Sequence, residues 1–486
     1  MPDPMQRFVD IGAQMPDKRT ADARQQDFGE IYDAYTPETA AAQSSRCEQC
    51  GIPYCQIHCP LQNNIPDWLR LATEGRMEEA YTISQATNTF PEICGRICPQ
   101  DRLCEGSCVL EQSRHTSVTI GAIEKYITDT AWDQGWVKGP VPSMEKGVSV
   151  GIIGAGPAGL AAADRLRARG YEVHVYDRYD RAGGLLIYGI PNFKLDKDIV
   201  QRRTRLLADS GVIFHSSFEV GRDATLADLR SKHAAVLIAT GVYKARELDA
   251  PGSGLNGIHA AMDYLTASNR KGLGDDAPSF DDGTLNTEGR NVVVIGGGDT
   301  AMDCVRTAVR QGAKSVKCLY RRDRLNMPGS LREVSNAEEE GVEFVWRAAP
   351  ESFLGDDVVS GIRAHRIRLG APDSTGRQTP EIIADSSFMM DADVVIKALG
   401  FDPEDLPTLF DEPALPVTRW GTIAIDPRTQ MTATPGVFAA GDIVRGASLV
   451  VWAIKDGRDS ADAIHSYLES GSVQEYEDAA ALAAAS

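Results

Sequence analysis

The sequence predicts an α/β protein in which two Rossmann-like dinucleotide-binding domains follow an α-helical segment rich in cysteine. A pattern of strand, glycine turn and helix occurs at residues 148–178 and again at residues 291–322. Eight of the ten cysteines lie between residues 47 and 108. With 486 residues, the chain is too long for one hydrophobic core, so several domains are expected.

The composition is that of a globular protein with a strong acidic balance. Apolar residues make up 42% and charged residues 24% of the chain. The formal net charge of -19 disfavours binding to nucleic acid or to an anionic membrane surface. No apolar run approaches the roughly 18 residues of a membrane span. The first 14 residues also lack the pattern of a signal peptide. We therefore expect a cytoplasmic protein that binds neither nucleic acid nor membranes.

Changes of pattern along the chain predict the domain boundaries. Residues 1–145 are expected to form a helical domain, with helical spacing over residues 65–86 and a Gly- and Pro-rich linker at residues 135–146. The first 45 residues, helical over 20–34, form either an exposed lead-in or an arm that docks a partner. A first nucleotide-binding domain is expected from residues 146–245 and 401–486, with a frayed tail, and a second from the inserted residues 246–400.

The first glycine loop carries the dinucleotide fingerprint between a strand and a helix. Gly154 permits a tight turn, Gly156 lets the backbone approach a pyrophosphate, and Gly159 lets helix and strand pack closely. The next strand, over residues 171–176, ends at Asp177, where an acid hydrogen-bonds an adenosine ribose. A plain glycine turn is the alternative, and the agreement of all these features disfavours it. The candidate binding residues here are Gly154, Ala155, Gly156, Pro157, Ala158, Gly159, Asp177 and Arg178.

Two further segments indicate that this dinucleotide is FAD. Gly183, Gly184 and Leu185 resemble a flavoprotein loop that packs near the isoalloxazine ring. Far downstream, a strand runs into Gly441 and Asp442, as in the motif whose acid binds the ribityl chain. A helix around residues 448–463 would point its N-terminal dipole at the flavin, although an ordinary core helix is equally compatible with the pattern. The FAD site is thus predicted to use both ends of the chain.

The second glycine loop favours NADPH. An apolar strand over residues 291–295 leads into Gly296, Gly298, Asp299, Thr300 and Ala301, where alanine replaces the third glycine. The following strand delivers Arg321 and Arg322 in place of an acid. Guanidinium groups suit the 2'-phosphate of NADPH. A solvated basic turn is the alternative, because Arg324 extends the run.

Two apolar strands on either side of the second unit end in similar tripeptides. One contains Thr240 and Gly241 and the other spans residues 398–400. They look like the two crossings between an FAD domain and an inserted NADPH domain in the glutathione-reductase-like architecture.

NADPH bound at the second loop would transfer a hydride to the flavin, and the N-terminal cysteines are expected to carry the electrons away from it. Cys304 and Cys318 are predicted to be inert core residues on a helix and a strand. The remaining thiols have spacings and Cys-Pro steps typical of two [4Fe-4S] clusters, whereas zinc is disfavoured because only one short C-x2-C pair is present. No catalytic acid or base is predicted, since hydride transfer mainly needs stacking and orientation. The candidate metal ligands are Cys47, Cys50, Cys55, Cys59, Cys94, Cys98, Cys104 and Cys108.

Over nearly the whole chain, these motifs resemble the small (beta) subunits of bacterial NADPH-dependent glutamate synthases. The stretches that carry the resemblance are residues 47–60, 88–104, 154–159, 296–301 and 441–445. The resemblance implies that NADPH reduces FAD and that two [4Fe-4S] clusters relay electrons to a large (alpha) subunit. That subunit would carry FMN and a further iron-sulfur cluster, and would make L-glutamate from L-glutamine and 2-oxoglutarate. A hetero-oligomer of alpha-beta protomers is also implied.

The resemblance further implies a ligand set for each cluster. Cys47, Cys50, Cys55 and Cys108 would hold one cluster, and Cys59, Cys94, Cys98 and Cys104 the other, with Glu124 as a distant substitute for Cys94. The same module occurs in dihydropyrimidine dehydrogenases and in NADPH-ferredoxin transferases, so an electron-input subunit for another acceptor is the alternative function. A zinc-bearing scaffold without activity is a third reading, and the two intact fingerprints disfavour it.

Overall fold

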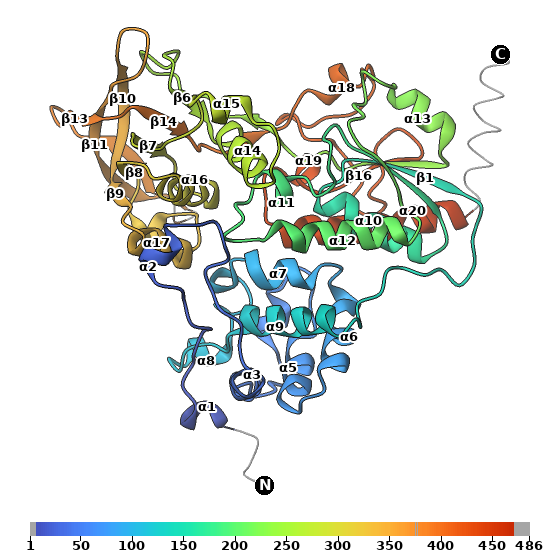
Figure 1. The fold of residues 1–486 in the computed structure, drawn as a ribbon. Helices are drawn as coiled ribbons and strands as arrows, with labels where there is room; N and C mark the ends of the chain where they lie inside the picture. Colours follow the sequence, from blue (N-terminus) through green and yellow to red (C-terminus); the bar gives the residue numbers. More distant parts are fainter. Residues whose placement is uncertain (1–5, 375, 377, 471–486) are drawn as a thin grey trace.

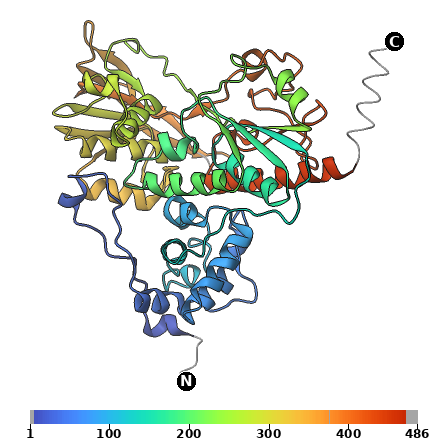
Figure 2. The ribbon, with the colours of Figure 1, turned by 45° about the vertical axis from the view of Figure 1, so that its right-hand side comes forward.

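The computed structural model describes residues 6–374, 376 and 378–470, which form three folded units. Figure 1 shows a helical unit below two α/β units, and Figure 2 shows the same arrangement from a second direction. The tail expected at the end of the chain lies outside the described residues. Across the described ranges, no helix is long and apolar enough to cross a membrane.

The helical unit packs around a core that includes Trp68, Leu69, Ile123 and Ile127, all of them buried. The helical pattern over residues 65–86 forms two helices, because the chain turns at Gly75 with a φ of +75°. The helices are α3 (Pro37–Ser44), α4 (Tyr54–Ile57), α5 (Ile65–Thr73), α6 (Met77–Thr87), α7 (Pro91–Ile97), η1 (Gln100–Arg102), α8 (Val109–Gln112) and α9 (Ile120–Asp133).

The segment before this unit is an arm that packs on its own chain. Lys18 and Arg24 each lie 2.7 Å from a carboxylate oxygen of Glu339, and Arg24 lies 3.2 Å from Glu340. In Figure 1 the middle of the arm lies beside the helix that carries Glu339, and the chain then returns to the helical unit. The expectation of an exposed lead-in is therefore wrong for this part of the arm, and the helix expected over residues 20–34 is limited to its first turn. The helices involved are α1 (Arg7–Asp10), α2 (Ala21–Arg24) and α17 (Leu331–Glu339).

The first α/β unit is built on a parallel sheet with strand order β16-β4-β1-β2-β3. β16 (Val437–Ala439) comes from the far end of the chain and closes one edge. The other strands are β1 (Ser149–Ile153), β2 (Glu172–Tyr176), β3 (Ile213–His215) and β4 (Ala235–Ile238).

Two long helices of this unit, α10 (Pro157–Ala168) and α20 (Val450–Glu469), pack directly on each other. A Cβ atom at Gly457 would lie 2.1 Å from the carbonyl oxygen of Ala158, so only glycine permits this approach. The C-terminal helix is thereby fixed against the helix that follows the first glycine loop.

The second α/β unit has a parallel sheet with strand order β6-β14-β7-β8-β9. A four-stranded antiparallel sheet packs beside it, which no motif in the sequence had indicated. The elements are β6 (Ile258–Ala260), α14 (Ala261–Gly272), α15 (Pro278–Asp281), β7 (Asn291–Ile295), α16 (Asp299–Arg310), β8 (Ser315–Tyr320), η2 (Arg324–Asn326), β9 (Glu343–Trp346), β10 (Ala348–Leu354), β11 (Gly361–Pro372), β12 (Gln378–Ile382), β13 (Phe388–Asp391) and β14 (Val394–Lys397).

Two chain crossings join the α/β units. Gly241 follows β4 and Gly400 follows β14, and just beyond them β5 (Lys244–Ala245) and β15 (Phe401–Asp402) pair antiparallel. The second unit is thus inserted into the first. The predicted fold class, two Rossmann-like units after an α-helical one, is confirmed.

Candidate functional site

One cavity collects most of the residues predicted for the first dinucleotide. It encloses about 1170 Å³ of empty space, part of it open to solvent. Asp299 and Thr300 of the second α/β unit, and Ile97 and Pro99 of the helical unit, complete its wall. All three units therefore meet at this cavity. The predicted residues that line it are Gly154, Gly156, Pro157, Ala158, Asp177, Leu185, Thr240, Gly241, Gly441 and Asp442.

The first glycine loop leaves room for a phosphate at the start of α10. Gly154 has a φ of +108°, and a Cβ atom there would lie 2.4 Å from the carbonyl oxygen of Ala239. A Cβ atom at Gly159 would lie 1.9 Å from the carbonyl oxygen of Gly154. At Gly156, which precedes α10, a Cβ atom would meet nothing within 4 Å. The unpaired N–H groups of α10 thus face a space that a pyrophosphate can enter.

Loops from both ends of the chain close on this turn. A Cβ atom at Gly184 would lie 2.9 Å from the Cα atom of Gly156, and the backbone N–H of Gly183 donates to the carbonyl oxygen of Ala155 at 2.8 Å. Gly441 has a φ of +77° and lies against the side chain of Ala158. The segments that the sequence assigned to one flavin site are therefore neighbours in space.

The polar side chains of the cavity differ in their bonding. The Thr240 hydroxyl is buried and has no hydrogen-bond partner among the described residues. Asp177 accepts a hydrogen bond from the backbone N–H of Ala155 at 2.6 Å, and burial raises the pKa of its carboxyl group. Asp442 accepts a hydrogen bond from the Ser448 hydroxyl at 2.6 Å. A buried hydroxyl without a partner is costly, so Thr240 fits a site that a ligand completes.

A second cavity adjoins the first at Asp177 and contains residues that the sequence did not reveal. Arg178 forms a 2.9 Å ion pair with Glu404, and its guanidinium lies over the rings of Tyr179 and Tyr243. These aromatic rings suit the adenine end of a dinucleotide. No local motif marks Tyr243 or Glu404, because they reach the site from separate segments of the chain.

The second glycine loop repeats the geometry of the first. Gly296 has a φ of +152°, and a Cβ atom there would lie 2.2 Å from the carbonyl oxygen of Ala398. At Gly298, which precedes α16, a Cβ atom would meet nothing within 4 Å. Ala301 is buried in the first turn of α16, consistent with its replacing the third glycine. A phosphate can therefore approach the start of α16 as well.

Arg321 and Arg322 lie just after β8, and no described carboxylate pairs with them. Within residues 6–470 as described, neither forms an ion pair, whereas the nearby Arg324 lies 2.5 Å from Glu338. The Nε atom of Arg322 is buried and has no hydrogen-bond partner in the part of the chain that the structure describes. Among the described residues, no carboxylate neutralises these two guanidinium groups, so their charge is available to a phosphate.

The first set of N-terminal cysteines surrounds a small cavity in the helical unit. Cys47, Cys50, Cys55 and Cys108 line it together with apolar side chains. Burial raises the pKa of the Cys47 thiol to about 11, and the Cys108 and Cys50 thiols are close enough to add to the shift. All four are free thiols. Four convergent thiols around a hollow form the donor set that a [4Fe-4S] cluster takes.

The second set lies nearer to the α/β units. A hydrogen bond with Cys94 and burial raise the pKa of Cys98, and the Cys104 thiol adds to the shift. Burial raises the pKa of Cys59 to about 11, with contributions from Glu124 and Cys94. Cys94 and Cys104 therefore lie near Cys98, and Cys94 and Glu124 lie near Cys59.

Glu124 is a buried carboxyl group held by amides. Its Oε1 atom accepts hydrogen bonds from Asn63 at 3.0 Å and from Asn88 at 3.2 Å. The Cys94 thiol lies 3.7 Å from the side-chain oxygen of the same Asn88. Glu124 is therefore linked to the second cysteine set through one shared amide.

The two remaining cysteines lie in the core of the second α/β unit. Cys304 on α16 and Cys318 on β8 are fully buried, free thiols. Their burial agrees with the expectation of inert core residues.

Two family models match the chain. Residues 24–136 match the family described as "Dihydroprymidine dehydrogenase domain II, 4Fe-4S cluster", and residues 148–457 match "Pyridine nucleotide-disulphide oxidoreductase". The first match covers the helical unit with its cysteines. The second covers both α/β units.

Similar proteins extend these matches to the full length of the chain. The "Glutamate synthase [NADPH] small chain" of Azospirillum brasilense is 70% identical over 95% of this chain and 95% of its own length. The protein of the same description from Escherichia coli K12 is 46% identical over 95% of this chain and 98% of its own. Among solved structures, Mycobacterium tuberculosis FprA in complex with NADPH has a TM-score of 0.57 at 21% identity, covering 67% of this chain and 85% of that one, which shows a shared fold.

Proposed function

Because this chain belongs to the family of NADPH-dependent glutamate synthase small chains, we propose that it is the electron-input subunit of a glutamate synthase. It oxidises NADPH at FAD and passes the electrons through two [4Fe-4S] clusters to a large subunit that carries FMN and a further iron-sulfur cluster. That subunit makes L-glutamate from L-glutamine and 2-oxoglutarate.

The meeting of three units at one cavity is the observation that carries the proposal. Asp299 and Thr300, at the start of the second nucleotide-binding helix, line the same cavity as the first glycine loop. Pro99, which directly follows Cys98, lines it as well. An electron donor, a flavin and a cluster would therefore lie in sequence around one space, which is the arrangement that stepwise electron transfer needs.

The residues of the chain bind and orient the reactants. Backbone N–H groups at the start of α10 would hold the FAD pyrophosphate, and the Thr240 hydroxyl would donate to the cofactor. The start of α16 would hold the NADPH pyrophosphate, with Arg321 and Arg322 on its 2'-phosphate. Bound FAD supplies the step from hydride transfer to release of single electrons.

For the clusters, we assign Cys47, Cys50, Cys55 and Cys108 to one and Cys59, Cys94, Cys98 and Cys104 to the other. The cavity around the first set and the mutual effect of the thiols in the second support this assignment. The free thiols also agree with a cytoplasmic location, where disulfides are rare. Assembly as a hetero-oligomer of alpha-beta protomers belongs to the same proposal.

An electron-input subunit for another acceptor is the second candidate, favoured by the match of the helical unit to a dihydropyrimidine dehydrogenase domain. One experiment separates the two candidates. The purified chain, with its iron and FAD measured, is mixed anaerobically with the large subunit of its own organism. We expect NADPH-dependent glutamate formation from glutamine and 2-oxoglutarate. A chain that reduces ferredoxin with NADPH, but neither binds the large subunit nor supports glutamate formation, would favour the second candidate.

A further inference from the structure

The loop between Cys98 and Cys104 touches the second α/β unit directly. The Asp101 carboxylate accepts hydrogen bonds from the Ser330 hydroxyl at 3.1 Å and from the backbone N–H of Leu331 at 3.2 Å. Arg102 donates to the carbonyl oxygen of Pro328. A loop that lies between two cysteines of the second set is therefore bonded to the segment that precedes α17.

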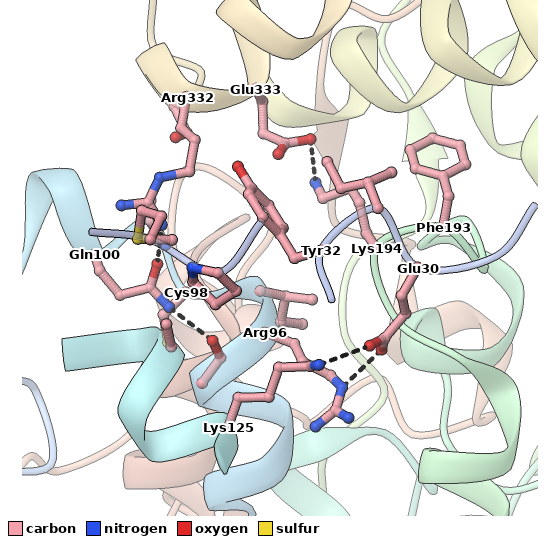
Figure 3. Close-up of a pocket in the computed structure, with 18 of the residues that line it drawn as sticks. Glu30, Tyr32, Arg96, Cys98, Gln100, Lys125, Phe193, Lys194, Arg332 and Glu333 are labelled. Carbon is pink, nitrogen blue, oxygen red and sulfur yellow. Dashed lines mark hydrogen bonds and ion pairs between the residues drawn. The ribbon is translucent and has the colours of Figure 1, made fainter. Parts of the chain in front are cut away.

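Arg332, on α17 of the second α/β unit, in turn donates hydrogen bonds to side chains of the helical unit. Its guanidinium donates to Gln100 at 3.3 Å and to the Glu105 carboxylate at 2.7 Å. Gln100 in turn donates to the carbonyl oxygen of Cys94 at 3.1 Å, and Glu105 accepts from the backbone N–H of Gly121 at 3.0 Å. Figure 3 shows Arg332 and Gln100 reaching toward each other from the two units.

The same segment, residues 328–332, also forms hydrogen bonds with the second glycine loop. The backbone N–H of Gly329 donates to the carbonyl oxygen of Gly297 at 3.0 Å. The backbone N–H of Ser330 donates to the Asp299 carboxylate at 3.0 Å. Asp299 is the first residue of α16 and lines the cavity of about 1170 Å³ beside the first glycine loop, which we call the flavin cavity. A short chain of hydrogen bonds thus runs from Asp101 through Ser330 to the NADPH-binding loop.

The first α/β unit contacts this region through Lys194, and the neighbouring Phe193 ring lies against the guanidinium groups of Arg306 and Arg310 on α16. The Lys194 ammonium lies 2.9 Å from Asp303 on α16 and 3.7 Å from Glu333 on α17. Lys194 lines both the flavin cavity and the neighbouring cavity in Figure 3. The region around the start of α17 therefore contacts both the first α/β unit and the helical unit.

Hydride transfer requires that the nicotinamide and the flavin be placed accurately relative to each other. The reacting atoms must approach to about 3–3.5 Å, and an error of about 1 Å can lower the rate a hundredfold. The second glycine loop lies on a unit that two chain crossings join to the first, with polar contacts such as the Lys194–Asp303 and Arg181–Asp275 ion pairs between them. Domains with polar interfaces of this kind move relative to each other by default. Contacts to a third unit can remove that freedom.

We propose that Asp101 and Arg332 are positioning residues for hydride transfer, which hold the NADPH-binding loop against the flavin cavity from the helical unit. This inference rests on the proposed function. The cysteine-rich unit then acts at two stages: it fixes the geometry of the first step and conducts the electrons released by that step.

The test is anaerobic stopped-flow reduction of the flavin by NADPH, with Asp101→Ala, Ser330→Ala and Arg332→Met compared at equal FAD and iron content. We expect the limiting rate of flavin reduction to fall about tenfold or more, while the Kd for NADPH changes little. Ser330→Thr keeps the hydroxyl and should restore the rate. Lys146→Met removes an ion pair to Glu469 away from the cavity and serves as the matched control.

A second measurement shows whether the step affected is the first one. Variants reduced by dithionite should pass electrons to the large subunit at the wild-type rate. Flavin reduction at the wild-type rate in Ser330→Ala and Arg332→Met with full iron content would refute the inference. So would slower transfer from dithionite-reduced clusters with unchanged flavin reduction. Failure of NADPH to reduce the wild-type flavin would instead contradict the proposed function.

Discussion

Three arginines near the end of β8 lie within four residues of one another and have different electrostatic environments. Arg324 is neutralised by Glu338, while Arg321 and Arg322 have no carboxylate partner among the described residues. A charge that already has a partner gains little from a phosphate, whereas an unpaired guanidinium gains a charge-assisted hydrogen bond. Position relative to the glycine loop and the absence of a partner together single out Arg321 and Arg322.

Replacement of Arg321 and Arg322 by alanine should weaken NADPH selectively. Hydrogen bonds to charged groups contribute about 1.5–3 kcal/mol each, so we expect the KM for NADPH to rise about tenfold or more. The KM for NADH, which lacks the 2'-phosphate, should change little. Steady-state reduction of ferricyanide with each nucleotide measures both values. Arg324→Gln is the matched control, and equal losses for NADPH and NADH would exclude a role in 2'-phosphate binding.

At the scale of elements, α7 of the helical unit is joined to α12 (Lys197–Asp209) of the first α/β unit by a buried ion pair. Arg203 donates to the two carboxylate oxygens of Glu92 at 2.7 and 3.0 Å, and both side chains are at most 1% exposed. The Arg203 guanidinium also lies over the rings of Phe90 and Trp132. The pair therefore fixes α7, which carries Cys94, to the flavin-binding unit.

Glu92→Gln should destabilise this interface, because it leaves the Arg203 charge buried without a counter-charge. Loss of one partner from a buried pair costs about 3–5 kcal/mol. A double variant, Glu92→Met with Arg203→Met, should recover most of that loss since no unpaired charge remains. Thermal unfolding followed by flavin fluorescence measures the effect. A single variant as stable as the wild type would show that the pair contributes little.

The helices and strands also show which features of the fold can be predicted from the sequence. Both glycine loops could be located because a turn, a strand and a helix of fixed spacing are local features. The ion pairs of Arg24 with α17, and the contact of Asp101 with Ser330, join residues more than 200 positions apart, and no spacing rule describes them. In the sequence, Gly457 looks like any glycine in a helix, and only its contact with α10 in the structure shows why glycine is needed there. Residues that form the glycine loops through local geometry were thus predictable, and residues that hold units together were not.

At the scale of the whole molecule, one surface of the helical unit exposes apolar side chains beside the first cysteine set. Ile52, Tyr54 and Ile57 are 62%, 48% and 55% exposed, although they flank Cys50 and Cys55. Exposed apolar groups next to a redox centre are typical of a surface that a partner covers. We expect the large subunit to dock there.

Ile52→Asp and Ile57→Asp should therefore weaken the complex with the large subunit. Truncating a central interface residue costs about 2 kcal/mol or more, which corresponds to roughly thirtyfold in Kd. NADPH-dependent ferricyanide reduction by the isolated chain should stay unchanged. Ile382→Asp, at an equally exposed isoleucine on β12, is the matched control. Calorimetric titration with the large subunit gives the affinities, and equal values for all variants would place the interface elsewhere.

The closing of the first sheet by β16 has a consequence for biosynthesis. All eight N-terminal cysteines emerge from the ribosome within the first quarter of the chain, whereas β16, Gly441 and Gly457 emerge only in its last tenth. The helical unit can therefore receive iron and sulfide while most of the protein is still being translated. FAD has no complete site until residue 457 has been added and α20 has folded back on α10. We therefore expect iron and sulfide to enter before flavin, and bound flavin to mark a chain that has been synthesised past both nucleotide-binding units.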